Sequence, residues 1–441
     1  NVVDTNKERI EQWNNSDLTK LPIFEPGLDK IIKETRGKNL HFSSDIRSAI
    51  AKSDMIFLCV NTPTKNKGFG AGQASDLKWI ESCARQVANY STKHTIVIEK
   101  STLPVRTAET IKTILNSSLD KDSLEKKTFA VLSNPEFLAE GTAINDLQNP
   151  DRVLIGGEDE NSINQISMIY EKWIDPKKII TTNLWSSELS KLVANAFLAQ
   201  RISSINSISA LCEETGANIQ EVSKAVGTDT RIGNKFLNAG PGFGGSCFKK
   251  DILNLVYLSE YFGLHEVAKF WESVVKLNNW HQSRISKLIT KKLFGTISGK
   301  KIIILGFAFK GNTNDTRESA AIQICKDLID EGAFLFIHDP KVSKEQIIND
   351  LGSKPYSESK KQLNSFNEKG NWEFINDIDE SLFDADAIVI LTEWEEYKNI
   401  NWDLAQERMR KPAWIFDSRS LIDPEDIKRN DFNFWRIGDG S

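Results

Sequence analysis

Residues 240–251 surround one cysteine with glycines, two lysines and an acid, and this setting suits Cys247 to act as a nucleophile. The glycines of residues 240–245, here named the glycine-rich loop, let the backbone approach a bulky substrate closely. The adjacent lysines favour the thiolate, which is the form that attacks a carbonyl carbon. This motif alone is equally compatible with a buried, inert cysteine beside a loop.

Two glycine motifs in the chain resemble phosphate-binding signatures but fail on context. The glycine-rich loop satisfies G-x-G-x-x-G, yet residues 231–237 before it are not a β-branched strand, which a dinucleotide fingerprint requires. Residues 306–313 nearly match a P-loop, but Asn312 stands where that motif needs lysine. Nucleotide hydrolysis is therefore rejected, because the β- and γ-phosphates would lack their main counter-charge.

Composition excludes several classes of protein. The 441 residues are 39% hydrophobic and 27% charged with a net charge of −5, which predicts a globular chain of two or three domains and no nucleic-acid binding. The longest apolar runs are far shorter than the ~20 residues that span a bilayer, so no membrane association is expected. Five scattered cysteines and five dispersed histidines predict reduced thiols, a cytoplasmic location and no metal site.

Short apolar runs that alternate with helical patterns predict α/β architecture. Strands are expected at 55–60, 95–98, 129–132, 153–155, 302–305, 334–337 and 387–392, in parallel units. Thr102 and Pro104 are expected to cap and begin a helix, and residues 186–214 to form one long helix. The pattern predicts two Rossmann-like doubly wound domains joined by a long central helix. Polar residues 352–371 are expected to form an exposed loop.

Residues 1–4 read as the end of a strand that closes on the acid Asp4. In a Rossmann unit such an acid follows the phosphate-binding glycines by ~20 residues and bonds the adenosine ribose. Those glycines do not precede Asp4, so the chain is expected to be truncated at its N-terminus.

Five motifs in order carry a close resemblance to the eukaryotic type of the UDP-glucose 6-dehydrogenase family, within the nucleotide-sugar dehydrogenases. Besides the segment around Cys247, they are Glu99–Thr102, Ser133–Ala143, Ser186–Leu192 and Gly306–Lys310, and the resemblance extends from residue 1 to about 420. It implies an NAD-binding domain at 1–180, which would lack its first strand and glycine-rich turn. It further implies a central helical dimerisation and catalytic region at 181–298 and a UDP-sugar-binding domain at 299–441.

The activity that the resemblance implies is oxidation of UDP-glucose to UDP-glucuronate by two NAD⁺, through a thiohemiacetal and a thioester on Cys247. A homo-oligomer, either a dimer or a hexamer built as a trimer of dimers, is also implied. Two alternatives stay open. Another nucleotide-sugar 6-dehydrogenase would act on UDP-N-acetylmannosamine or GDP-mannose, and a catalytically silent assembly subunit would fit the missing glycines.

Lys191 and Asn195 lie four residues apart on one helical face, where an ammonium and a carboxamide could stabilise an oxyanion. Spacing alone would equally fit a solvated lysine and an interhelical asparagine, and the resemblance favours the catalytic role. The implied catalytic residues are Cys247, Lys191, Asn195, Asp251, Glu136 and Thr102. Asp251, one helical turn beyond Cys247, and Glu136 would orient a water or move its proton, and Thr102 would hold that water.

The resemblance also implies the binding residues. Those for NAD are Asp4, Arg9, Val60, Asn61, Thr62, Pro63, Thr64, Ser101, Thr102, Glu140, Cys247, Lys250 and Arg317. Those for the UDP-sugar are Glu136, Phe137, Leu138, Ala139, Glu140, Lys191, Asn195, Arg231, Phe236, Phe243, Gly244, Phe248, Phe309, Lys310 and Arg419.

Overall fold

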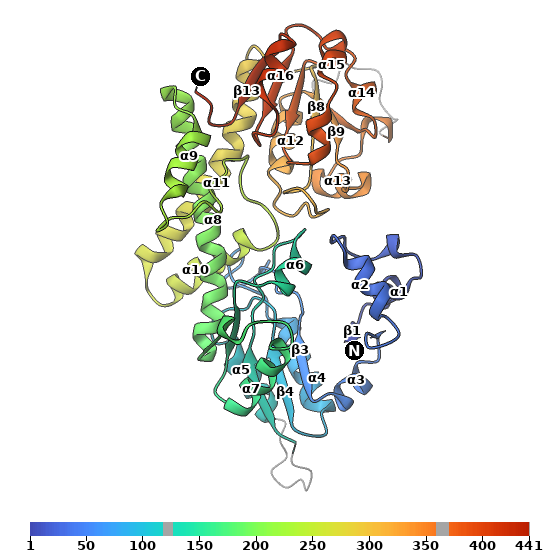
Figure 1. Ribbon diagram of the computed structural model, residues 1–441, viewed down its shortest axis with the longest axis vertical. Helices are drawn as coiled ribbons and strands as arrows, with labels where there is room; N and C mark the ends of the chain where they lie inside the picture. The colour runs from blue at the N-terminus through green and yellow to red at the C-terminus, as the bar shows by residue number, and fades with distance from the viewer. Residues whose placement is uncertain (118–126, 359–369, 441) are drawn as a thin grey trace. The chain divides into compact units, whose positions relative to one another are not determined.

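The computed structural model describes residues 1–117, 127–358 and 370–440 (Figure 1). The chain divides into two compact units, of which unit 1 comprises residues 1–195 with 250–268 and unit 2 comprises 196–249 with 269–441. Three helices, α8 (Leu184–Thr215), α10 (Phe248–Tyr261) and α11 (His265–Lys292), run in sequence from one unit into the other, and α9 spans Ile219–Thr228.

Unit 1 contains a five-stranded sheet in the order β3-β4-β5-β6-β7, with helices around it. Its strands are β3 (Met55–Leu58), β4 (Thr95–Glu99), β5 (Phe129–Ser133), β6 (Val153–Gly156) and β7 (Ile179–Thr182). A separate parallel pair joins β1 (Val2–Val3) to β2 (Phe42–Ser43). The helices are α1 (Lys7–Asn14), α2 (Leu28–Thr35), α3 (Ile46–Lys52), α4 (Lys78–Tyr90), α5 (Thr107–Ser117), α6 (Ala143–Gln148) and α7 (Glu160–Tyr170).

Unit 2 contains a six-stranded sheet in which every adjacent pair is parallel and the order is β10-β9-β8-β11-β12-β13. Its strands are β8 (Lys301–Leu305), β9 (Phe334–His338), β10 (Asn371–Phe374), β11 (Ala387–Ile390), β12 (Trp414–Asp417) and β13 (Asn433–Arg436). Its helices are α12 (Ala320–Asp330), α13 (Lys344–Leu351), α14 (Ile378–Ser381), α15 (Trp402–Arg408) and α16 (Pro424–Arg429).

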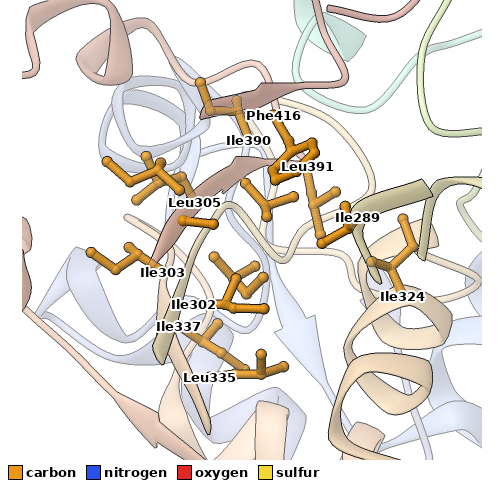
Figure 2. Packing of buried hydrophobic residues seen from close by; sticks show 14 of the residues in the cluster. Ile289, Ile302, Ile303, Leu305, Ile324, Leu335, Ile337, Ile390, Leu391 and Phe416 are labelled. Carbon is orange, nitrogen blue, oxygen red and sulfur yellow. The ribbon is translucent and has the colours of Figure 1, made fainter. Parts of the chain in front are cut away.

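The strand order of unit 2 is that of a doubly wound dinucleotide fold, in which ligands bind where the order reverses. Here the reversal lies between β8 and β11, so the loops that follow residues 305 and 390 border the expected crevice. Strands buried on both faces need continuous apolar sequence, and Ile302–Leu305 and Ala387–Ile390 supply it. Figure 2 shows Ile302, Ile303 and Leu305 of β8 in this core, with Ile324 from α12 and Ile289 from α11.

The architecture confirms the predicted fold class of two Rossmann-like units connected by long helices. Among the described residues, no helix combines the length and the apolar character of a membrane span. The predicted domain boundaries stay predictions, because compactness assigns part of the central helices to each unit.

Two details of the sequence prediction are wrong. Strand β6 pairs antiparallel with β5, whereas parallel units were expected throughout. The sequence does not reveal the direction, because a strand of four buried residues has the same apolar pattern in either direction. Helix α5 begins at Thr107 and not beside Thr102 and Pro104. The carboxylate of Glu188 instead accepts hydrogen bonds from the backbone N–H groups of Arg106 (2.7 Å) and Ala108 (2.8 Å) at the start of that helix. The predicted loop at 352–371 lies partly outside the described residues.

Candidate active site

Lys191 and Asn195 are both buried, with 4% and 5% of their surface exposed, and both lie on α8 in unit 1. The ammonium Nζ of Lys191 lies 3.4 Å from Oε1 of Glu136 and 5.3 Å from the centre of the Phe137 ring. The side-chain amide of Asn195 donates a 2.6 Å hydrogen bond to Oδ2 of Asp251. Buried polar groups of this kind need partners, and these contacts exclude the solvated lysine that spacing alone allowed.

Asp251 lies in the first turn of α10 and is almost fully buried, with 1% of its surface exposed. Its second carboxylate oxygen lies 3.3 Å from Nζ of Lys250. That ammonium also donates to the hydroxyl of Thr62 (3.2 Å), whose hydroxyl in turn donates to the backbone carbonyl of Thr102 (3.0 Å). These contacts connect Asn195 with four other predicted residues of unit 1, namely Asp251, Lys250, Thr62 and Thr102.

The loop after β5 carries the predicted wall residues Glu136, Phe137, Leu138, Ala139 and Glu140. Oε2 of Glu136 accepts the N–H of Leu138 at 2.6 Å, which fixes the carboxylate against its own loop. The guanidinium of Arg152 lies 3.8 Å from the centre of the Phe137 ring, a favourable cation–π contact. Glu136 therefore reaches Lys191 from a well-supported loop.

Several predicted cofactor residues of unit 1 follow the carboxyl ends of strands. Asp4 follows β1, and one of its carboxylate oxygens lies 3.8 Å from the guanidinium of Arg9, while the other accepts the N–H of Asn6. Val60, Asn61, Thr62, Pro63 and Thr64 follow β3, and the hydroxyl of Ser101, after β4, donates to the carbonyl of Val60 at 2.7 Å. An accessible carboxylate at a strand end is a suitable acceptor for a ribose diol.

Cys247 directly precedes α10 and is partly buried in unit 2. Its sulfur lies 3.5 Å from the Ser246 hydroxyl. The lysines that follow it are paired elsewhere, since Nζ of Lys249 lies 2.8 Å from Glu318 and Lys250 bonds Asp251 and Thr62. The N-terminal end of α10 carries the positive end of the helix dipole, and it adjoins Cys247 in the chain more closely than these ammonium groups do.

The glycine-rich loop packs tightly against the segment that follows β8. The N–H of Gly245 donates to the carbonyl of Arg317 at 2.8 Å, and a Cβ at Gly244 would lie 2.6 Å from the carbonyl of Glu318. The Phe309 ring would lie 3.1 Å from a Cβ at Gly245, whose φ is +83°. Only glycine fits both positions.

The predicted cations of unit 2 have different surroundings. Arg419 is mostly buried, and its guanidinium bonds the carbonyls of Leu391 and Phe309 (both 2.8 Å) and lies 3.0 Å from Glu393. Nζ of Lys310 lies over the ring of Phe309 at 5.6 Å. Arg231 and Arg317 each pair with an acid two residues earlier, and the Arg231 side chain is 87% exposed. Arg231 thus lies in an exposed ion pair, and the ring of Phe236, at φ 62°, contacts the ring of Phe248.

Asp339 directly follows β9, at the position of the ribose-binding acid in a dinucleotide fold. Its Oδ2 already accepts the N–H groups of Phe307 (2.7 Å) and Ala308 (3.0 Å), and its Oδ1 accepts that of Lys341 (2.9 Å). Because this buried carboxylate is saturated by backbone donors, it cannot bind a ribose diol.

Two buried acids that sequence reasoning missed meet beside the site of unit 1. Glu99 ends β4 with 1% exposure, and its carboxyl interacts with that of Glu188 on α8. Burial, and then the charge of Glu188, raises the pKa of Glu99 well above its ordinary range, and burial also raises that of Glu188. Two carboxyls in contact can share a proton but cannot both ionise cheaply. The signal in the sequence was an acid that directly follows the apolar run Ile96–Ile98.

Replacing Glu99 by glutamine is expected to stabilise the fold at high pH. The pKa of Glu99 is higher in the folded state than in the unfolded state, so the contribution of Glu99 to stability is complete below the unfolded-state pKa. As pH rises above that value, the contribution declines by ~1.4 kcal/mol per pH unit for as long as Glu99 stays protonated in the folded state. Glu99→Gln keeps a neutral donor to Glu188. Thermal unfolding should show a higher midpoint than wild type at pH 8 and an equal one near pH 4.5.

The exposed acid Glu158, paired with Lys112 at 2.7 Å, supplies the control, because Glu158→Gln should show no gain at pH 8. A Glu99→Gln variant that is no more stable than wild type at pH 8 would contradict the shared proton.

Comparison with known proteins gives a consistent result along the chain. Family models of the UDP-glucose/GDP-mannose dehydrogenases match the NAD binding domain at residues 1–174, the central domain at 185–280 and the UDP binding domain at 303–424. UDP-glucose 6-dehydrogenase of Drosophila melanogaster is 52% identical over 99% of this chain and 90% of its own. That of Gallus gallus is 53% identical over 96% of this chain and 84% of its own.

Solved structures agree with these matches. A UDP-glucose dehydrogenase from Pyrobaculum islandicum superposes with a TM-score of 0.81 at 27% identity, covering 100% of this chain and 91% of the other. A UDP-D-ManNAc dehydrogenase from Pyrococcus horikoshii gives a TM-score of 0.78 at 25% identity, covering 99% and 93%. The chain therefore belongs to the UDP-glucose/GDP-mannose dehydrogenase family.

Proposed function

We propose that this protein is a UDP-glucose 6-dehydrogenase, which converts UDP-glucose, two NAD⁺ and water into UDP-glucuronate, two NADH and three protons. The observation that carries the proposal is identity above 50%, over nearly the whole chain, to animal UDP-glucose 6-dehydrogenases. Identity to the UDP-D-ManNAc dehydrogenase from Pyrococcus horikoshii is 25%. The UDP-glucose dehydrogenase from Pyrobaculum islandicum is similarly distant at 27% identity, so the choice of glucose rests on the animal relatives.

The bound nicotinamide supplies a hydride acceptor in each of the two oxidations. In the first, the C6 hydroxyl loses its proton as its carbon loses hydride, and the oxygen becomes negative in the transition state. Lys191 and Asn195 are held on one face of α8 by Glu136 and Asp251, and present an ammonium and an amide donor to such an oxygen. Preorganised donors of this kind stabilise the transition state more than the neutral hydroxyl.

Cys247 accounts for the second oxidation. An aldehyde resists loss of hydride until a nucleophile adds to it. The thiolate forms an S–C bond to C6 as the C=O π bond opens, and the oxygen takes up a proton to give a thiohemiacetal. Loss of the C6 hydrogen as hydride and of the hydroxyl proton gives the thioester. The start of α10 beside Cys247 favours the thiolate throughout.

Water then cleaves the thioester, releasing the carboxylate and the thiolate. Asp251 lies four residues beyond Cys247, hence one turn along α10, and is suited to orient that water. Glu136, beside Lys191, is the second candidate to accept a proton from the water. Thr102 belongs to the Asp251 network, because its backbone carbonyl accepts the hydroxyl hydrogen of Thr62.

Most of the residues expected to bind NAD belong to unit 1. Asp4 and Arg9 would hold the adenosine ribose, with residues 60–64, Ser101, Thr102, Glu140, Lys250 and Arg317 also in contact with the cofactor. The saturated Asp339 argues for a mononucleotide at the switch point of unit 2, where Phe309, Lys310 and Arg419 lie. The guanidinium of Arg419 would act chiefly by fixing the carbonyl of Phe309. We assign residues 1–180 to NAD binding, 181–298 to the central region and 299–441 to the UDP-sugar.

We further propose that the chain forms a homo-oligomer, either a dimer or a trimer of dimers. Large apolar side chains of α8 and α11 within unit 2 are exposed, including Phe197 (53%), Leu211 (58%) and Phe270 (49%). Exposed apolar side chains gathered on long helices are typical of subunit interfaces. Sedimentation velocity at micromolar concentration distinguishes these assemblies from a monomer.

A substrate panel tests the activity. With NAD⁺, the protein expressed from its complete coding sequence should form NADH with UDP-glucose at a kcat/KM at least about a hundredfold higher than with UDP-N-acetylmannosamine or GDP-mannose. A preference for either of the latter sugars would replace the proposal by the corresponding dehydrogenase.

A further inference from the structure

We propose that Asn206, Asn278 and His281 are positioning residues, which hold the glycine-rich loop and thereby place Cys247 for reaction. This inference rests on the proposed function, because it concerns the same nucleophile. The three side chains are buried, with 1%, 4% and 1% of their surface exposed. All three belong to unit 2, Asn206 on α8 and the other two on α11.

Four hydrogen bonds connect these side chains to the loop backbone. Oδ1 of Asn206 accepts the N–H of Gly240 at 2.9 Å, and Nε2 of His281 lies 2.9 Å from the Gly240 carbonyl oxygen. Asn278 bonds both backbone groups of Phe243, accepting its N–H at 2.8 Å and donating to its carbonyl at 3.1 Å. An irregular loop has no neighbouring strand to satisfy its backbone, and these side chains supply the missing partners.

The side chain of Phe243 carries this constraint toward Cys247. Its ring is buried and meets the ring of Phe248 edge to face, with centroids 6.0 Å apart. Phe248 follows Cys247 directly and is the first residue of α10. A shift of Phe243 would therefore displace the ring of Phe248, which is the residue next to the nucleophile.

The opposite side of the loop is equally confined, by the carbonyls of Arg317 and Glu318 and the ring of Phe309. Gly242, at φ +137°, lets Asn278 come close, since a Cβ there would lie 2.9 Å from the Asn278 oxygen. The loop is thus fixed between α11 on one side and residues 309–318 on the other.

His281 acts in this arrangement as a neutral donor. A carbonyl only accepts, so Nε2 must carry the hydrogen, and the buried Nδ1 has no hydrogen-bond partner among the described residues. Burial, and then the charge of Arg284, lowers the pKa of His281 to about 4, while the Gly240 carbonyl and Glu213 oppose the shift. The imidazole therefore stays uncharged at neutral pH, and a neutral amide of the right length can replace it.

The test compares Asn278→Ala and His281→Ala with His281→Gln, which retains an N–H donor near Nε2. The matched control is Ser286→Ala, because Ser286 is a buried, hydrogen-bonded residue of α11 whose partner is Asp327. A misplacement of about 1 Å costs up to ~100-fold in rate. Both alanine variants should lose at least tenfold in kcat for UDP-glucose oxidation, with KM within about threefold of wild type. His281→Gln should recover most of the lost kcat.

The outcomes separate this proposal from the function on which it rests. If wild type does not oxidise UDP-glucose, the proposed function fails. If wild type is active and both alanine variants retain the kcat of Ser286→Ala, the positioning role is wrong. Where an alanine variant does not fold, the pair His281→Gln and His281→Asn decides, since the shorter amide cannot reach Gly240. Equal kcat values for that pair would overturn the proposal.

Discussion

Cys247→Ala is expected to abolish UDP-glucuronate formation, by at least about a thousandfold in kcat, while UDP-glucose affinity stays within a few-fold of wild type. The thiolate makes and breaks bonds to C6 but contributes little to binding, so its loss should affect kcat and not substrate affinity. Chromatographic measurement of UDP-glucuronate and calorimetric titration of UDP-glucose measure the two effects. The first hydride transfer does not involve the thiolate and should persist, leaving the aldehyde.

Cys83→Ala supplies a control, since Cys83 is a partly buried thiol on α4, remote in sequence from the glycine-rich loop. It should leave kcat unchanged. Full turnover by Cys247→Ala would exclude a covalent mechanism, and the glycine-rich loop would then be a substrate wall without a nucleophile.

Lys191→Ala is expected to slow the first hydride transfer by about a hundredfold or more, which corresponds to ~3 kcal/mol for one oxyanion donor. The ammonium stabilises a negative C6 oxygen far more than a neutral hydroxyl, so KM should change little. The substitution also leaves Glu136 without its cation, but that side chain is 30% exposed, and water can solvate it. Single-turnover kinetics of NADH formation measure the effect.

Asn195→Ala should combine with Lys191→Ala less than additively in the first step if both donors contact one oxyanion. The structure adds a second effect, because Asn195 donates to the buried carboxylate of Asp251. Thioester hydrolysis should therefore also slow in Asn195→Ala, and not in Lys276→Ala, an exposed lysine control on α11. Strict additivity, or a change in KM alone for Lys191→Ala, would contradict the shared oxyanion.

The repeating apolar pattern predicted most of the fold, because parallel strands buried on both faces need uninterrupted Ile, Val and Leu. Ile302–Leu305 and Ala387–Ile390 are strands as expected, and the predicted helix at 186–214 matches α8. The direction of β6 was not predictable, since direction depends on the connection to β5 and not on the residues of the strand. The start of α5 was missed because its cap, Glu188, comes from 80 residues later in the chain.

The residues of the candidate site were also predicted only in part. Lys191, Asn195 and Asp251 were identified by a spacing of four on a helix and by resemblance, and the structure gives them partners. Asn206, Asn278 and His281 were missed because each is a polar residue within a long helix, where sequence alone cannot distinguish a buried side chain from a solvated one. Their role depends on which loop packs against them, which only tertiary structure determines.

Mass spectrometry of Cys247→Ser tests the covalent mechanism most directly. The serine variant of the protein from its complete coding sequence is incubated with UDP-glucose and NAD⁺, quenched and digested. An oxyester hydrolyses slowly at a site built for a thioester, so the peptide that contains residue 247 should carry an adduct with the mass of the UDP-glucuronyl group. Cys247→Ala should carry none. Turnover of Cys247→Ser at the wild-type rate with no adduct at residue 247 would contradict a covalent intermediate at this position.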